Sequence, residues 1–598
     1  MPDNIVVDSF LIGKSFGQPY MPKNFTELVF LVTIISRIWL VRIKAWILLT
    51  YFNDNIYPWN YFYLARDLFL AYLVIERLSS VFSFVYGYGV VGATKRIAHS
   101  VSTRVAKFIL SLPPIKKKID AELSSTIGKM EGELMKNDEK LLQLKELPNE
   151  GLKADVIVKE LDKLQELKHS NWLDGRVSGA VYHGGDELLQ LQSTAYHKYS
   201  VANQLHPDVF PGVRKMESEV VSMVLNIFNA PPEGCGATTS GGTESLLLAG
   251  LSAREFARQH KGISHFEVIA PVTVHAGIEK ACYYFGMTLH KVDLDPKTYQ
   301  VDINKVKRLI NSNTVLLVGS APNYPHGIID DIEELSKLAV KYKIPLHVDA
   351  CLGSFIVSFL ERSKVHGEAP IPLFDFRLPG VTSISCDTHK YGFAPKGSSI
   401  IMYRNPQLRE CQYYISTDWT GGMYGSSTLA GSRPGALMVG CWATLVNVGI
   451  AGYEKSCRDI VSTSMKVKKA IRNDKILRKY LDVIGEPIAS VIAFKLKDDF
   501  KQFNIYQLGD VLNKKGWHFS TLQRPSALHF AFTRLTVPVV DDLLADLVES
   551  IEELVEKTKD SAASKSDTAA LYGVAGSIST VGVADRVIVA FLDTLYKV

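Results

Sequence analysis

The sequence lacks the patterns that mark nucleic-acid-binding, disulfide-bonded and zinc-binding proteins. Its formal net charge is only +5 over 598 residues, so no concentrated basic face for nucleic acid is expected. The seven cysteines form no CxxC pair, which argues against a disulfide framework or a structural zinc site. They all follow residue 230, so we expect the main body to lie in the reducing cytosol. Their positions are 235, 282, 351, 386, 411, 441 and 457.

Signatures of secretion and of dinucleotide binding are also missing. The N-terminal stretch MPDNIVVDSF lacks a basic region and an apolar core, so no cleavable signal peptide is expected. A G-x-G-x-x-G pattern does occur at 87–92. About 20 residues later, where a dinucleotide site needs an acidic residue, the sequence reads LSLPPIKKK. We therefore assign these glycines to a membrane-proximal segment.

Two apolar runs lie in the first 115 residues. The run at 29–52 contains Arg37, Arg42 and Lys44. Each cation near a bilayer centre costs roughly 2.5–3.5 kcal/mol, so this run is predicted to be an interfacial helix.

The run at 56–78 is the better candidate for a membrane span. It begins with an aromatic cluster, and the stretch from 57 to 75 contains about 19 residues, close to the roughly 20 that cross a bilayer. Arg66 and Asp67 lie inside it as adjacent opposite charges. We predict a single span at about 57–75, with a buried amphipathic helix as the alternative.

Cations follow the predicted span, at Lys95, Arg96, Arg104 and the lysine run 116–118. The positive-inside bias then places the downstream body in the cytosol and the N-terminus in a lumen. The sequon at Asn24 fits a lumenal N-terminus. One uncleaved span near the N-terminus favours the endoplasmic reticulum membrane.

Residues from about 200 to 440 alternate between strand-like and helical patterns. Strands are predicted at 265–271, 314–322, 344–350 and 381–387, with amphipathic helical stretches such as DDIEELSKLAVKYK between them. This order predicts an α/β fold with a mostly parallel sheet. Ligands bind such sheets beyond the carboxyl ends of the strands, so the residues after each strand are the candidates for chemistry.

The stretch at 240–245, SGGTES, opens a helical segment with small residues. The free backbone N–H groups of a helix N-terminus make an anion site, most often for phosphate. An ordinary capped turn is the alternative. This loop is not a Walker loop, because it contains no G-K-[ST].

Three further side chains follow strands. His275 could stack on a flat ligand, although a structural histidine is the simpler interpretation. Asp349 ends an apolar strand, where a carboxylate is costly unless it is paired; a cationic ring nitrogen would be a suitable partner. Lys390 follows the last strand, and Lys396 lies beyond it in APKGSS.

An anion site, a stacking histidine, a buried aspartate and a strand-end lysine together point to pyridoxal 5′-phosphate. The phosphate takes the helix N-terminus, the ring nitrogen pairs with Asp349, and the aldehyde condenses with Lys390. Each signal is weak or moderate alone; the ordered set carries the prediction.

The chain resembles the sphingosine-1-phosphate lyases (dihydrosphingosine phosphate lyases), fungal members in particular, within the group II pyridoxal-phosphate-dependent decarboxylases. The resemblance runs from about residue 170 to the C-terminus. It is carried by VSGAVYHGGD, NQLHPDVFPGVRKMESE, TSGGTESLLLA, PLHVDACLGSF, SCDTHKYGFAPKGSS, TLAGSRPG and ALYGVAG. It implies the aspartate-aminotransferase type fold with a small C-terminal α+β domain.

The resemblance also implies residue roles. Lys390 is the Schiff-base lysine, His275 stacks on the ring and Asp349 pairs with its nitrogen. Gly242 and Thr243, with His389, hold the cofactor phosphate. The substrate-phosphate side is lined by Tyr182, Asn203, His206, Lys396 and Arg433. Asn323 and His326 lie near the cofactor.

The implied activity is cleavage of the C2–C3 bond of a sphingoid base 1-phosphate, giving a long-chain aldehyde and phosphoethanolamine. Lys396, the substrate phosphate or a tyrosine could be the base. The partners implied are the membrane and a second subunit in a homodimer. An amino-acid decarboxylase of the same fold and an inactive membrane-tethered scaffold are the alternatives.

Composition and resemblance together divide the chain into five parts. These are a lumenal segment and anchor at 1–115, a helical arm and the start of the catalytic body at 116–200, a large cofactor-binding domain at 201–440, a small C-terminal domain at 441–560, and a linker and tail at 561–598.

Overall fold

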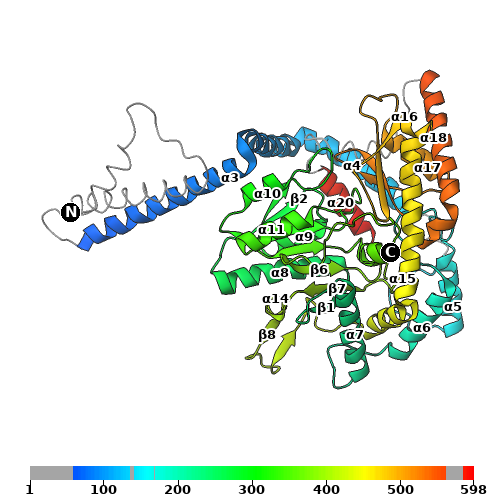
Figure 1. Cartoon of the computed structure of the whole chain (residues 1–598), viewed down its shortest axis with the longest axis horizontal. Coiled ribbons are helices and arrows are strands. Elements are labelled where there is room, and N and C mark those ends of the chain that lie inside the picture. Colours follow the sequence, from blue (N-terminus) through cyan, green and yellow to red (C-terminus); the bar gives the residue numbers. More distant parts are fainter. Residues whose placement is uncertain (1–57, 135–140, 168, 561–582, 598) are drawn as a thin grey trace. The chain divides into compact units, whose positions relative to one another are not determined.

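The computed structural model describes residues 58–134, 141–167, 169–560 and 583–597 (Figure 1). The predicted interfacial helix at 29–52, the sequon at Asn24 and the ALYGVAG motif at 570–576 lie outside the described residues. The chain forms two compact units, Met1–Phe84 and Val85–Val598.

The predicted span lies in helix α3 (Pro58–Ser111). Its first half exposes apolar side chains such as Phe69 and Ile75. Inside it, Arg66 Nη2 lies 2.7 Å from Asp67 Oδ1, so the two charges pair as adjacent opposite groups. Two helices of the described chain are long and apolar enough to cross a membrane, by length and composition only. They are α3 from Phe62 onward, with none of its apolar window buried, and α15 (Gly435–Asn473), with 44% of its apolar window buried. Burial of this extent is typical of a core helix in a soluble fold, so α3 is the better candidate.

The glycine-rich stretch at 87–92 lies within α3 and not between a strand and a helix. Gly89 has φ 69° and ψ 162°, and the helix axis changes direction there. A positive φ of this kind strains residues with a Cβ atom, which explains glycine at this position. The dinucleotide interpretation, rejected from the sequence, has no support in this geometry.

A seven-stranded sheet forms the centre of the second unit, in the order β1-β7-β6-β5-β4-β2-β3 (Figure 1). Its parallel strands include all four that the sequence predicts: β2 (Glu267–Pro271), β4 (Thr314–Ser320), β5 (Leu346–Asp349) and β6 (Val381–Cys386). β7 (Ser399–Tyr403) is antiparallel to both its neighbours, so the sheet is mostly parallel, as predicted. The remaining strands are β1 (Cys235–Thr239) and β3 (Thr288–Val292).

The inner strands of the sheet are largely buried because helices cover both of its faces. All seven residues of β4 are buried. The covering helices are α7 (Pro211–Ile227), α8 (Gly242–Lys261), α9 (Ala276–Tyr284), α10 (Ile303–Leu309) and α11 (Ile332–Tyr342). Short helices join later strands: α12 (Ser354–Val357), α13 (Leu360–Ser363) and α14 (Pro406–Glu410), with the hairpin β8 (Tyr414–Ser416) and β9 (Tyr424–Ser426).

A second, antiparallel sheet follows α15, in the order β10-β11-β13-β12. Its strands are β10 (Leu481–Val483), β11 (Val491–Leu496), β12 (Ser520–Leu522) and β13 (Ala527–Ala531). The helices around it are α16 (Leu477–Tyr480), α17 (Ile505–Lys514), the 3-10 helix η2 (Arg534–Val539) and α18 (Val540–Asp560). Trp517 is fully buried in this region.

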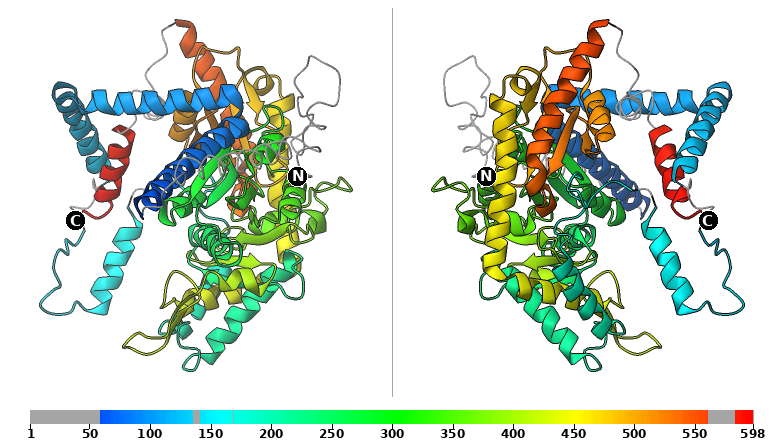
Figure 2. Two further views of the ribbon diagram at one scale, coloured as in Figure 1. Left: turned by 90° about the vertical axis from the view of Figure 1, so that its left-hand side faces the viewer. Right: turned by 90° about the vertical axis from the view of Figure 1, so that its right-hand side faces the viewer.

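Helices that precede the central sheet in sequence include the expected arm. They are α4 (Pro113–Leu134), α5 (Ala154–Gln165) and α6 (Asp186–Tyr199). The C-terminal helix α20 (Val583–Thr594) lies beside α4 in both views of Figure 2. An ion pair between Arg586 and Asp120, with 2.6 Å between Nη1 and Oδ1, joins these two helices.

Candidate active site

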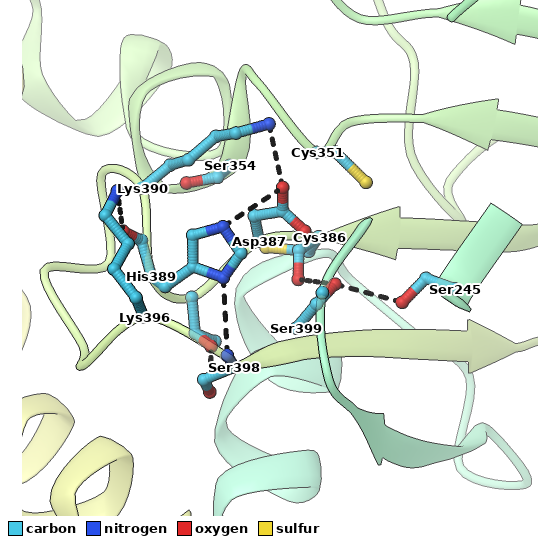
Figure 3. Close-up of polar contacts among 12 residues, drawn as sticks. Ser245, Cys351, Ser354, Cys386, Asp387, His389, Lys390, Lys396, Ser398 and Ser399 are labelled. Atoms are coloured by element: carbon cyan, nitrogen blue, oxygen red, sulfur yellow. Dashed lines mark hydrogen bonds and ion pairs between the residues drawn. The ribbon is translucent and has the colours of Figure 1, made fainter. Parts of the chain in front are cut away.

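Lys390 lies in the loop that connects β6 to the antiparallel strand β7 (Figure 3). The loop is closed at its base by a 2.5 Å contact between Thr388 Oγ1 and Ser398 Oγ. His389 accepts a hydrogen bond at Nδ1 from the Ser398 N–H, over 3.3 Å. The predicted location at the end of a parallel strand is confirmed, and the loop is held by contacts along its length.

Asp387 is the carboxylate partner of Lys390. The Lys390 Nζ lies 2.7 Å from Asp387 Oδ2, and the Asp387 side chain is 3% exposed (Figure 3). Burial lowers the pKa of Lys390, but the negative charge of Asp387 outweighs it and the pKa of the lysine is raised. Burial likewise raises the pKa of Asp387, and the Lys390 ammonium more than reverses this. The two groups therefore form a buried ion pair.

The sequence reasoning missed Asp387. The signal was available: a carboxylate three residues before the lysine, at the end of a buried strand, is costly unless it is paired. The Asp387 Oδ1 atom is buried and has no hydrogen-bond partner in the described part of the chain. This site thus contains two strand-end carboxylates, of which the sequence analysis weighed only one.

Asp349 ends β5, the neighbour of β6. Its Oδ1 accepts a hydrogen bond from the Cys351 N–H at 3.0 Å and a long one from the Ser385 hydroxyl at 3.5 Å. His347 bridges Ser383 and Ser385 behind it, and burial lowers the pKa of His347 to about 4. A neutral imidazole therefore supports the Asp349 side of the site.

His275 caps the N-terminus of α9, directly after β2. Its Nδ1 accepts a hydrogen bond from the Gly277 N–H at 3.0 Å, which fixes the ring. Its side chain is exposed. The strand order puts β4 between β2 and β5, so His275 lies at the same sheet edge as Asp349 but contacts neither Asp349 nor Lys390 among the described contacts.

The predicted anion site is the N-terminus of α8. Gly241 caps this 20-residue helix, and Glu244 folds back to accept a hydrogen bond from the Ser240 N–H at 2.7 Å. A Cβ atom on Gly242 would lie 2.8 Å from Asp387 Oδ1 and 2.9 Å from Cys351 Sγ, so a larger residue would displace one of them. A Cβ atom on Gly241 would lie 3.7 Å from His389 Cε1. The structure thus brings His389 to the glycine loop, and Thr243 is exposed beside it.

Lys396 lies against the ring of Tyr182, close to His389. The Lys396 Nζ lies 4.7 Å from the centre of the Tyr182 ring and 3.5 Å from the His389 carbonyl oxygen. Burial and the charge of Lys390 lower the pKa of Lys396. Burial raises the pKa of Tyr182 to about 12, so the phenol keeps its proton at neutral pH. A lowered lysine pKa beside a cation suits a proton-transfer group.

Asn203 and Arg433 form a separate group with Glu217. Asn203 Oδ1 accepts a hydrogen bond from the Arg433 N–H at 3.1 Å, and the Arg433 guanidinium pairs with Glu217. Arg433 also donates to Thr238 Oγ1 at 3.3 Å. His206 is exposed in the turn before α7. None of these residues contacts Lys390 within the described chain, so the substrate-side residues predicted together fall into two groups.

Asn323 and His326 follow β4 and are almost fully buried. Asn323 Oδ1 accepts the His326 N–H at 2.9 Å, while Asn323 Nδ2 and His326 Nδ1 have no partner in the described part of the chain. Burial lowers the pKa of His326 to about 4. Asn323 and His326 follow β4, which pairs with β5, the strand that ends at Asp349. Their unpaired polar atoms therefore lie at the same edge of the sheet as Asp349.

The residues present fit pyridoxal 5′-phosphate. At the entrance of α8, Gly242 packs closely against Asp387 and Cys351, where a Cβ atom would collide. The first N–H groups of this helix have no intrahelical partner and suit an anion such as phosphate. The second oxygen of Asp349 has no partner among the described contacts and can pair with a ring nitrogen. Lys390 supplies the amine. Lys390, Asp349 and the α8 terminus come from β6, β5 and β1 respectively, whose ends converge as the α/β order predicts.

The chain is similar to known pyridoxal-dependent enzymes. The pyridoxal-dependent decarboxylase conserved domain matches residues 143–497. The chain is 56% identical, over 90% of both chains, to a sphingosine-1-phosphate lyase of Saccharomyces cerevisiae. It is 40% identical to the rat sphingosine-1-phosphate lyase 1, over 86% of this chain and 88% of the relative.

Solved structures with the same fold include a bacterial member. A sphingosine-1-phosphate lyase of Burkholderia pseudomallei aligns with a TM-score of 0.66 and 38% identity, over 70% of this chain and 94% of that chain. A glutamate decarboxylase of Lactobacillus brevis aligns with a TM-score of 0.59 and 21% identity, over 69% of this chain and 95% of that chain, and so supports the fold alone.

Proposed function

This chain belongs to the sphingosine-1-phosphate lyases of the pyridoxal-dependent decarboxylase family, and from that membership we propose that it cleaves the C2–C3 bond of sphingoid base 1-phosphates. The products are a long-chain aldehyde and phosphoethanolamine. The observation that carries the proposal is the buried Lys390–Asp387 pair, set between Asp349 and the glycine entrance of α8.

Four groups of the chain would hold the cofactor. Lys390 holds its aldehyde, Asp349 its ring nitrogen, and Gly242 and Thr243, with His389, its phosphate; His275 covers the ring. When bound, pyridoxal 5′-phosphate supplies an aldehyde for the substrate amine and a ring that accepts electrons from the carbon whose bond breaks.

Asp387 gives Lys390 a defined place when it is not bonded to the cofactor. While the substrate amine occupies the cofactor aldehyde, the Lys390 amine would be free and could take a proton from solvent. At 2.7 Å, Asp387 would stabilise that ammonium and hold it in the site. Lys390 would then be available to donate this proton to C2, and its neutral amine to displace the product amine from the cofactor aldehyde.

The proton of the substrate 3-hydroxyl must leave as the C2–C3 bond breaks and the aldehyde forms. Lys396 suits this role because burial and the Lys390 charge lower its pKa, so a larger fraction is neutral than for an ordinary lysine. Tyr182 is the less suitable base because its pKa is about 12, and it is better placed to donate a hydrogen bond.

The substrate phosphate would meet Tyr182 and Lys396 from one subunit. Asn203, His206 and Arg433 lie in a different group, which suits residues that complete the site of a second copy in a homodimer. The lipid substrate is consistent with an anchor in α3, a catalytic body in the cytosol and an endoplasmic reticulum membrane, as the sequence pattern predicts.

The test is an assay of the purified full chain with dihydrosphingosine 1-phosphate, measuring aldehyde and phosphoethanolamine. Wild-type protein should release both in equal amounts and show the visible absorption band of bound cofactor, and Lys390→Ala should lose the band and the activity. Release of carbon dioxide from an amino acid in place of aldehyde would support the decarboxylase alternative. A wild-type chain that binds the cofactor but turns over neither substrate would support the scaffold.

A further inference from the structure

A small basic cavity lies where the kinked helix α3 meets the catalytic body. It has a volume of about 380 Å³ and is lined by α3 from Gly87 to His99, by the end of β3 and by α10. Four cations line it, against one carboxylate, Asp293. The cations are Lys95, Arg96, Lys291 and Lys305.

Two of these cations are not neutralised by a neighbouring carboxylate. Lys291 pairs with Glu279, and Lys305 lies 3.6 Å from Asp293 and 3.4 Å from Asp302. Lys95 and Arg96 form no ion pair with any described residue. The cavity therefore has an excess of positive charge on its α3 side, where an anion would be stabilised.

The α3 wall of the cavity is held firmly to the body. Tyr88 Oη lies 2.8 Å from His290 Nδ1, and Arg96 donates a hydrogen bond to the Lys291 carbonyl oxygen at 2.7 Å. The Arg96 guanidinium also lies 4.0 Å from the centre of the Tyr88 ring. A Cβ atom on Gly87 would lie 2.5 Å from Leu309 Cδ2, so glycine permits this close approach.

Apolar side chains remain exposed next to the cations. Val90 and Val91, on the same stretch of α3, are 72% and 69% exposed. Exposed apolar residues beside cations and an aromatic ring are typical of a segment at a membrane–water interface.

We propose that this cavity binds the phosphate of an anionic phospholipid headgroup at the membrane surface. The cations balance the negative charge of a headgroup phosphate, and Val90 and Val91 contact the boundary of the acyl chains. Such a site would fix the body against the leaflet that supplies the substrate. The inference rests on the proposed membrane association of α3.

The proposal is tested on the full, cofactor-loaded chain in neutral detergent, by calorimetric titration with short-chain phosphatidic acid and, separately, with inorganic phosphate. Lys95→Glu should weaken phosphatidic acid binding at least about tenfold, because each cation near an anionic surface contributes about 1 kcal/mol and the substitution changes the charge by two. Lys95→Gln should have an intermediate effect. Arg104→Glu makes the same change of charge on the same helix outside the cavity, and should alter binding less than about twofold.

Equal losses in Lys95→Glu and Arg104→Glu would overturn the site in favour of diffuse charge. Unchanged binding in Lys95→Glu would place the lipid elsewhere, and inorganic phosphate that binds as tightly as the lipid would identify a free-phosphate site instead. Anchoring and lyase activity are measured separately, by alkaline extraction of membranes and by aldehyde release in detergent. A wild-type chain that is not anchored, or that releases no aldehyde, would contradict the proposed function, while the titration would remain interpretable. Lys95→Glu should keep its lyase activity in detergent.

Discussion

Replacement of Asp387 by asparagine tests the most distinctive contact of the site. The side chain keeps its size, but the carboxylate that lies 2.7 Å from Lys390 Nζ is lost. At an effective dielectric constant of about 20, two unit charges at this distance attract by about 6 kcal/mol. Without that attraction, the lowering of the Lys390 pKa by burial is opposed much less. The pKa of Lys390 should therefore fall markedly in cofactor-free protein.

The assay is competitive labelling of lysines with acetic anhydride across a pH series, with the extent of labelling at Lys390 read by mass spectrometry. Only the neutral amine reacts, so the Asp387→Asn protein should label Lys390 at clearly lower pH than wild type. Asp349→Asn is the matched control: it removes the other strand-end carboxylate, which should leave the Lys390 profile close to wild type. An unchanged profile in Asp387→Asn, or an equal shift in both variants, would refute the assignment of Asp387 as the partner of Lys390.

Three further predictions address the rest of the site. Gly242→Ala should weaken cofactor binding by about 1–3 kcal/mol, because the added Cβ atom overpacks against Asp387 and Cys351. Cofactor titration measures this, and Gly128→Ala, where a Cβ atom meets nothing within 4 Å, should leave binding unchanged. Equal affinity in both variants would contradict the assignment of Gly242 to the phosphate site. Lys396→Ala should keep the visible band and lose turnover. In wild type, a kcat that falls as pH decreases through the lowered pKa of Lys396 identifies this lysine as a base. A KM that rises as pH increases through the same pKa identifies it as a contact of the substrate phosphate. The His347 pKa of about 4 in the folded protein lies below its unfolded value of about 6.5, so stability is full above pH 6.5 and is lost as pH falls towards 4. At pH 5 this loss of unfolding free energy is about 2 kcal/mol. The decrease in unfolding free energy between pH 7.5 and 5, measured by denaturant titration, should be smaller by that amount in His347→Gln than in wild type, and an equal decrease in both proteins would count against a neutral buried imidazole.

The strand-end residues were predictable because their positions follow from hydrophobic patterning. The run TVLLVGS is almost entirely apolar, and VTSISC combines β-branched and small residues, which indicates buried strands and where they end. Lys390 and Asp349 could then be placed at one edge of a sheet without any knowledge of their contacts. The strand β7 was not predicted, although it determines the shape of the Lys390 loop, because SIIMY is too short to indicate its direction.

The contacts between side chains could not be predicted in the same way. The pairing of Lys390 with Asp387 depends on how a twelve-residue loop closes between two antiparallel strands, and a single sequence does not specify that closure. The engagement of Arg433 with Glu217 is a contact between residues 216 positions apart. Long-range pairs of this kind depend on the assembled fold, whereas the period of a strand depends only on its own residues.

The two lysines of the SCDTHKYGFAPKGSS motif show how the same residue type acquires different chemistry from its surroundings. Burial lowers the pKa of each, although Lys396 is the more exposed of the two. Lys390 has a carboxylate at 2.7 Å and so remains a cation when it is free, whereas Lys396 faces the Tyr182 ring and feels the charge of Lys390, so it loses its proton more readily. After burial, the charge on Lys390 is the main cause of the lowered proton affinity of Lys396. The charge of the Lys390 amine changes during turnover, so the pKa of Lys396 should change at the same stage. Substitution of Asp387 should therefore alter the pKa values of both lysines.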